Sequence, residues 1–225
     1  MRRVVTLYRS SVGKKVIMAV TGVVWVGFVV AHMVGNLKAF QGAEKIDHYG
    51  EFLREMGAPV FGHGQLLWVL RIGLLVTIVV HVLAATQLTL MSWRARPVSY
   101  KVAPHMELSY ASRTMRWGGV IIGLFVIYHL MHFTVGNVHP DFEPGGVHHN
   151  LVVGFRSWPV ALVYIVAMGA LAVHLYHGVW SMFQTLGINH PKYNRYRRPL
   201  AAVLAAAVFV GFVSVPIGVL AGAIQ

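Results

Sequence analysis

The stretch VIMAVTGVVWVGFVVAHMVGNL, residues 16–37, decides the fold, because it contains no charged side chain and has one histidine near its far end. A helix of about 20 apolar residues is long enough to cross the hydrocarbon core of a bilayer. Four later stretches have similar length and apolar character: 66–91, 117–138, 158–182 and 200–224. The sequence therefore predicts an all-α integral membrane protein, in which one domain, residues 1–225, forms a bundle of five transmembrane helices.

The composition supports this class and restricts the chemistry. The chain has 225 residues, of which 56% are hydrophobic and 12% charged, and its mean hydropathy is +0.62. These values exclude an ordinary water-soluble domain. Because there is no cysteine, disulfides and cysteine-ligated zinc or iron–sulfur centres are excluded within the chain. The first span is too long for the core of a signal peptide, so we expect it to be retained.

The charge distribution predicts the orientation. Five alternating helices place fourteen of the basic residues on one side: Arg2, Arg3, Arg9, Lys14, Lys15, Arg94, Arg96, Lys101, Arg113, Arg116, Lys192, Arg195, Arg197 and Arg198. Four lie on the other: Lys38, Lys45, Arg54 and Arg156. The positive-inside rule then predicts a cytoplasmic amino terminus and an external carboxyl terminus in the cell membrane. Six of the seven acidic residues lie outside, with only Glu107 inside.

The net charge of +12 does not indicate a nucleic-acid partner, because the basic residues follow the membrane topology. Two interpretations of the cationic inner face stay open, namely contact with anionic lipid and docking of a cytoplasmic partner. The outer connections, residues 38–65 and 139–157, are rich in Gly, Pro and His. They have room for short interfacial helices or a small-molecule site.

Each of the first four spans carries a histidine well inside the apolar stretch: His32, His81, His129 and His174. Ionisable residues in a bilayer are costly and usually mark a functional site. From the helical rise, His32 lies about 24 Å and His129 about 18 Å from the inner boundary. The second and fourth spans run inward, so His81 and His174 lie about 22 to 24 Å from the outer boundary. This predicts two pairs, His32 with His129 in the outer half and His81 with His174 in the inner half.

Two imidazoles at each of two depths are the ligands that two six-coordinate haems need, and such haems suit electron transfer. A copper or zinc site would instead gather three or four ligands at one point. A proton relay would use carboxylates, and none of the five spans contains Asp or Glu. We therefore expect two b haems.

Spacing leaves part of the ligand assignment open. His132 and His177 follow His129 and His174 by three residues, so each couple shares a helical face. By depth, His132 matches His32 at least as well as His129 does, whereas His177 fits worse than His174. The glycines of Gly119-x-x-x-Gly123 have two explanations as well: close helix packing, which we favour, or room for a flat macrocycle.

Three segments carry a family resemblance. They are AHMVGN (residues 31–36), FVIYH (residues 125–129) and HLYHGVWS (residues 174–181). They resemble the haem motifs of helices one, three and four in the single-chain dihaem cytochrome b subunit, b558 type, of succinate dehydrogenases and fumarate reductases. The resemblance covers nearly the whole chain. It implies that His32 and His129 bind the outer haem and that His81 and His174 bind the inner one.

The resemblance also implies partners and substrates. In that family, a flavoprotein and an iron–sulfur protein dock on the cytoplasmic side, and the membrane subunit exchanges electrons with quinone, commonly menaquinone. The dicarboxylate reaction takes place in the flavoprotein. This chain would then have no catalytic residue for that reaction and would act as an electron-transfer subunit of the enzyme.

Further site residues are candidates only. Arg71, inside the second span, is expected to pair with a propionate of the outer haem, although it could also reach the interface or a quinone. For an outer quinone site the candidates are His48, Glu51, Glu55 and His63, and for an inner one Ser11, Lys14 and Lys15.

Three other functions compete with this interpretation. A cytochrome b561-like reductase also has one histidine in each of four consecutive helices, but it generally has six spans. A formate-dehydrogenase or hydrogenase cytochrome b more usually has four. A haem-free transporter with pH-gating histidines represents a different class.

Overall fold

Five long helices are apolar enough to cross a membrane in the computed structural model, which describes residues 10–95 and 110–225. They are α2 (Ser11–Asn36), α4 (Gln65–Arg94), α5 (Tyr110–Leu130), α7 (Trp158–Thr185) and α9 (Arg197–Leu220). The prediction of an all-helical, multi-pass membrane protein is thus confirmed. Six charged residues used in the topology argument lie outside the described residues: Arg2, Arg3, Arg9, Arg96, Lys101 and Glu107. The side chain of Arg113 is not described either.

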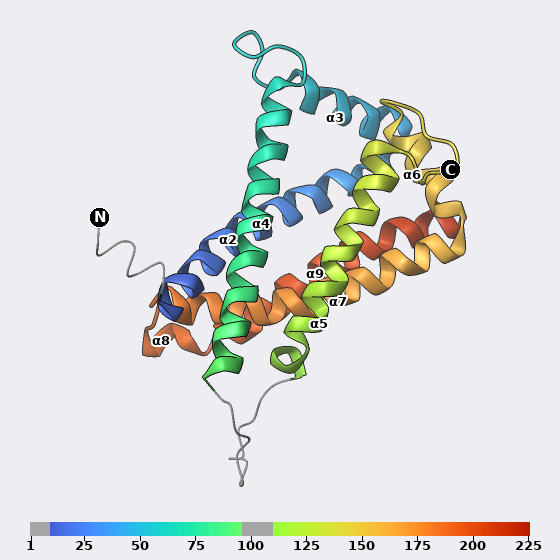
Figure 1. Ribbon diagram of the computed structural model, residues 1–225. Helices are drawn as coiled ribbons and strands as arrows, with labels where there is room; N and C mark the ends of the chain where they lie inside the picture. The colour runs from blue at the N-terminus through green and yellow to red at the C-terminus, as the bar shows by residue number, and fades with distance from the viewer. Residues whose placement is uncertain (1–9, 96–109) are drawn as a thin grey trace.

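Shorter helices fill the connections. A 3-10 turn (Leu37–Gln41) leads into α3 (Ala43–Glu55), α6 (Val147–Arg156) precedes α7, and α8 (Pro191–Asn194) joins α7 to α9. Figure 1 shows α3, α6 and the carboxyl terminus on one side of the bundle and α8 on the opposite side. We call these the α3/α6 side and the α8 side.

The third and fifth spans end several residues earlier than predicted. The third span continues as α-helix only to Leu130, and its last turn, Met131–Val135, is a π-helix that ends at Gly136, whose φ is 84°. The fifth span stops at Leu220 rather than at residue 224, because Gly222 takes a φ of 72° and the amides of Ala223 and Ile224 bond to the Gly218 carbonyl. Ile224 then turns back into the core and is only 3% exposed.

The centre of the bundle is formed by α2, α7 and α9, which pack on one another, while α4 packs on α2 and α5 packs on α7. One buried cluster lies among the three central helices and consists of Val29, Leu175, Ala205 and Val208. A larger cluster closes the α3/α6 side, where Ile46 of α3, Leu151 and Phe155 of α6, and Val215 of α9 meet. This arrangement leaves α4 and α5 each attached by one face to the central helices.

The charges that the structure describes fall at the helix ends expected from the sequence. Lys14 and Lys15 at the start of α2, Arg94 at the end of α4 and Arg116 near the start of α5 belong to the α8 side. The Arg116 guanidinium lies 5.7 Å from the centre of the Trp93 ring, which brings those two ends together. Lys38, Lys45, Arg54 and Arg156 belong to the α3/α6 side.

Candidate functional site

Two pairs of histidines face each other across the bundle. The ring centres of His32 on α2 and His129 on α5 are 5.9 Å apart, with the rings inclined by 76°. Those of His81 on α4 and His174 on α7 are 6.4 Å apart. These are the partners predicted from helix direction and rise. We call them the His32/His129 pair and the His81/His174 pair.

The spacing within each pair suits one metal ion between two imidazoles. A metal–imidazole bond is about 2 Å long and the nitrogen lies about 1 Å from the ring centre, so trans ligands have ring centres about 6 Å apart. Among the residues that the structure describes, no group of three or more His, Asp or Glu side chains converges on a metal-binding point. Each pair would therefore supply two imidazole ligands, the number that a six-coordinate haem iron takes from a protein.

His81 is held in the state that a ligand needs. Its Nδ1 lies 2.9 Å from Thr21 Oγ1, and the Thr21 hydroxyl donates its proton to the carbonyl of Ile17 at 2.8 Å. With that proton engaged, the hydroxyl accepts from Nδ1–H of His81, which leaves the lone pair on Nε2 for a metal. A second hydrogen bond joins α2 and α4, in which Trp25 Nε1 donates to Thr77 Oγ1 at 3.1 Å.

His174 has one buried ring nitrogen, Nδ1, without a hydrogen-bond partner in the described part of the chain. Nδ1 of His177 and Nε2 of His132 are also buried without such a partner, so this feature does not by itself distinguish His174 from the other two histidines. Aromatic rings flank the other pair. Phe28 stacks on His32 with ring centres 5.3 Å apart, and Phe125 stacks on His129 at 5.8 Å.

The glycines of the third span border open space rather than a packed helix. A Cβ built at Gly119 or Gly123 would meet no described neighbouring atom within 4 Å, and the same holds for Gly27 on α2. Helix packing within this chain, the explanation favoured from the sequence, therefore does not account for these residues. The open space beside these glycines leaves room for lipid or for a flat macrocycle, and the paired imidazoles fit the latter.

Tyr164 on α7 separates the roles of His129 and His132. Its hydroxyl lies 3.3 Å from Nδ1 of His129 and 3.0 Å from Nδ1 of His132, so it can accept from one imidazole and donate to the other. His132 lies in the π-helical turn and is 0% exposed. Its ring packs on Phe133, at 4.2 Å between ring centres, rather than on His32. The structure thus brings His129, and not His132, against His32.

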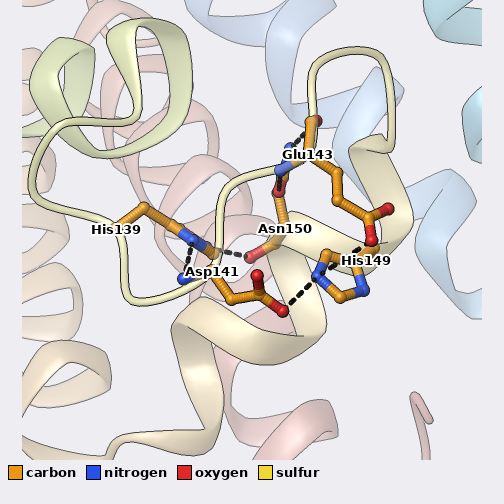
Figure 2. Close-up of polar contacts among 5 residues, drawn as sticks. All are labelled: His139, Asp141, Glu143, His149 and Asn150. Carbon is orange, nitrogen blue, oxygen red and sulfur yellow. Dashed lines mark hydrogen bonds and ion pairs between the residues drawn. The ribbon is translucent and has the colours of Figure 1, made fainter.

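Figure 2 shows a loop before α6 that is held by polar contacts of His139, Asp141, Glu143, His149 and Asn150. His139 accepts from the amide of Asp141 at 3.1 Å and donates from Nε2 to the carbonyl of Asn150 at 2.8 Å. The Asn150 side chain holds the loop by two hydrogen bonds, because its Oδ1 accepts from the backbone amide of Glu143 and its Nδ2 donates to the backbone carbonyl of Glu143. The His139 ring lies 4.9 Å from that of His132, so this hydrogen-bonded loop packs on the buried His132 ring.

The candidates for an outer quinone site lie on the exposed rim of the α3/α6 side. Glu51 pairs with Arg54 at 3.1 Å and with Nδ1 of His63 at 3.8 Å, while His48 and Glu55 are exposed. A separate polar cavity on the same side contains none of these four and is lined by Ala43, Asp47, His148, His149, Val152, Val153, Arg156 and Gln225.

The remaining candidates are dispersed. The Arg71 guanidinium lies 5.1 Å from the centre of the Trp68 ring, and the side chain is exposed, away from the described contacts of the His32/His129 pair. On the α8 side, Ser11 and Lys15 are exposed whereas Lys14 is 7% exposed. His177 packs edge-on against Trp180 and has no ring contact with His81 among the described residues.

Three polar side chains near the histidine pairs were not singled out from the sequence: Tyr164 and Thr21, which contact the histidines, and Thr77, which bonds to Trp25. The signal was available, since each is a polar side chain inside an apolar span, where its hydroxyl needs a partner. Their partners could not be named, because each lies on another helix.

Comparison with known proteins identifies a family. A family model for the succinate dehydrogenase/fumarate reductase transmembrane subunit matches residues 94–213, from the end of α4 into α9. No curated protein and no solved structure matches the chain.

Proposed function

The chain belongs to the family of transmembrane subunits of succinate dehydrogenase and fumarate reductase, and from this premise we propose that it is the dihaem cytochrome b subunit of such an enzyme. In this role it carries electrons between an iron–sulfur subunit and quinone in the cytoplasmic membrane, commonly menaquinone, through two bis-histidine b haems. Succinate or fumarate reacts in the flavoprotein subunit.

The two facing histidine pairs support this proposal most directly. Four helices each contribute one imidazole, and the ring centres within the pairs are 5.9 Å and 6.4 Å apart. When bound, a haem with two imidazole ligands supplies reversible one-electron transfer and has no open position for oxygen. His32 and His129 are the proposed ligands of one haem, and His81 and His174 those of the other.

The surrounding residues orient these ligands. Thr21 accepts from His81 Nδ1 and so keeps the ring turned toward α7, while Tyr164 holds the Nδ1 edge of His129. Such outer contacts set the basicity of a ligand and its orientation. Phe28 stacks on His32 and Phe125 stacks on His129, which makes the immediate surroundings of this pair apolar.

Docking of the soluble subunits fits the α8 side. Lys15, Arg94, Arg116, Lys192 and Arg195 present positive charge there, which steers association with an acidic surface. Quinone is proposed to bind near the α3/α6 side, close to Arg71 and the Glu51 rim, with a second site near Ser11 and Lys14 at the other end. Arg71 remains the proposed propionate partner.

A reduced-minus-oxidised spectrum of the purified chain tests the function class. Bands of b-type haem with two haems per chain are expected, whereas a spectrum without them would eliminate every haem function and favour a transporter. Flavin and iron–sulfur subunits should co-purify; a cytochrome that purifies alone would instead favour a b561-like reductase.

A matched pair of variants tests the ligands of the inner haem. His174→Ala should reduce the haem content from two to one per chain. His177→Ala removes an imidazole one turn further along the same helix and should leave it at two. Loss of haem from the second variant alone would overturn the His81/His174 assignment.

A further inference from the structure

A polar cavity lies on the α8 side, where α7 ends and α9 begins. Its lining is Trp180, Gln184, Asn189, Asn194, Arg197 and Arg198. None of these is a proposed haem ligand or quinone candidate. The lining combines two guanidinium groups, three amides and one indole, all of which can donate hydrogen bonds to an anion.

Local contacts hold the two arginines in place. The Arg198 guanidinium lies over the Trp180 ring, 4.9 Å from its centre. Arg197 donates to the carbonyl of Ile188 and to Oδ1 of Asn189 at 3.3 Å. Asn194 bonds to the same Asn189 oxygen at 2.6 Å. The donors are therefore organised by the protein itself, which lowers the entropy lost on binding an anion.

Among the described residues, no carboxylate forms an ion pair with these cations. Its last acidic residue is Glu143, on the opposite side of the bundle, so residues 144–225 contain no Asp or Glu. Within the described residues, the ion pairs all lie on the α3/α6 side and involve Arg54, His63 and His149. An anion for Arg197 and Arg198 must therefore come from outside the described chain.

The cavity lies at the α8-side ends of α7 and α9, two helices apolar enough to cross a membrane, which is the level at which phospholipid headgroups are expected. Trp180 is six residues, about 9 Å, beyond His174 along α7, and tryptophan rings favour the headgroup level of a bilayer. On α9, Ala202 and Ala206 follow Arg198 at intervals of four residues, on the same face and both exposed. Small exposed side chains below a cationic group leave a track along which an acyl chain can lie.

We propose that this cavity binds the phosphate headgroup of an anionic phospholipid. Arg197 and Arg198 bind the phosphate, the amides of Gln184 and Asn194 bond to its oxygens or to the glycerol, and an acyl chain follows Ala202 and Ala206 into the membrane. Basic pockets between helix ends at a membrane surface are suited to such lipids. The α7–α9 packing that supports His174 is then stabilised by a bound lipid.

The test is a titration of the purified chain in neutral detergent with short-chain phosphatidylglycerol, followed by native mass spectrometry and by the midpoint of thermal unfolding. Phosphatidylcholine and inorganic phosphate serve as separate probes. We expect saturable binding of phosphatidylglycerol with a rise in the midpoint. Phosphatidylcholine should bind more weakly, and inorganic phosphate should have no comparable effect.

Variants identify the site. Arg198→Gln should weaken binding about fivefold, and Arg197→Gln together with it about thirtyfold. Arg195→Gln is the matched control, because this arginine belongs to the same segment but stacks on Tyr196, 4.7 Å from its ring centre, outside the cavity.

Three results would overturn the proposal. Equal binding of phosphatidylcholine would show that the charge is not recognised, and equal binding of inorganic phosphate would indicate a free-anion site. Unchanged lipid binding by Arg198→Gln, with loss of the co-purifying soluble subunits, would assign the cavity to protein docking. Each result leaves the haem proposal intact, since haem content is measured separately.

Discussion

Replacement of His129 and His132 by alanine, one at a time, should have different effects: the first should reduce the haem content, and the second should reduce stability. His129 faces His32 and is the proposed ligand, so His129→Ala should reduce the haem content from two to one per chain. His132 lies in a closed pocket and is 0% exposed, so His132→Ala should leave two haems.

The cost of the His132 variant follows from its surroundings. Its ring fills the space among Tyr128, Phe133, His139 and Tyr164, and truncation of a packed aromatic or large side chain to alanine costs about 2–5 kcal/mol. Loss of the contact with Tyr164, 3.0 Å long, contributes about 1 kcal/mol of that total. His132→Ala should therefore be clearly less stable than the parent protein.

The assay combines haem quantified per chain with thermal unfolding in detergent. His132→Gln is the companion variant, because its amide can still bond to Tyr164 and it should recover part of the lost stability. The reasoning is refuted if His132→Ala and His132→Gln each retain one haem while His129→Ala retains two. That result would exchange the roles of the two histidines and leave the helical fold unaffected.

Three other predictions concern single side chains. Tyr164→Phe should keep both haems but shift the midpoint potential of only the outer one in a redox titration, because the hydroxyl contacts one ligand; equal shifts of both would contradict this. Gly136→Ala should lower the free energy of unfolding by about 2–4 kcal/mol, since a Cβ there would lie 2.3 Å from Cγ of Phe142 at a φ of 84°. The control Gly145→Ala, at a φ of 92° with open space around it, should cost only about 1 kcal/mol, and equal losses would exclude the steric explanation. Arg71→Leu should weaken retention of the outer haem or shift its midpoint potential, and an unchanged redox titration would contradict the proposed contact between Arg71 and a haem propionate.

The pairing of the histidines could be predicted because it depends on few quantities. Chain direction alternates between successive spans and the helical rise is constant, so depth follows from residue number alone. His32 and His129 therefore had to lie at similar levels, as did His81 and His174. The family resemblance, carried by three short segments, agrees with the family model that matches residues 94–213.

The choice between His129 and His132 could not be predicted from spacing, since both lie on one face of an ideal helix. A π-helical turn at Met131–Val135 changes that geometry, and Tyr164 on another helix binds both rings. Close packing against another helix of this chain does not explain Gly119 and Gly123, since no described atom of another helix lies near them. Glycine spacing indicates only that a second helix could approach closely, and it does not indicate that one is present.

The sequence by itself determined that this protein is a five-span membrane protein with imidazoles at two depths, because hydropathy, charge asymmetry and helical rise are properties of a linear chain. Only the tertiary structure decided which side chains meet: Thr21 with His81, Tyr164 with His129 and His132, and Arg198 with Trp180. These contacts depend on how each helix is rotated and packed against its neighbours. The partners are far apart in the sequence, and the position of His132 also depends on the π-helical turn.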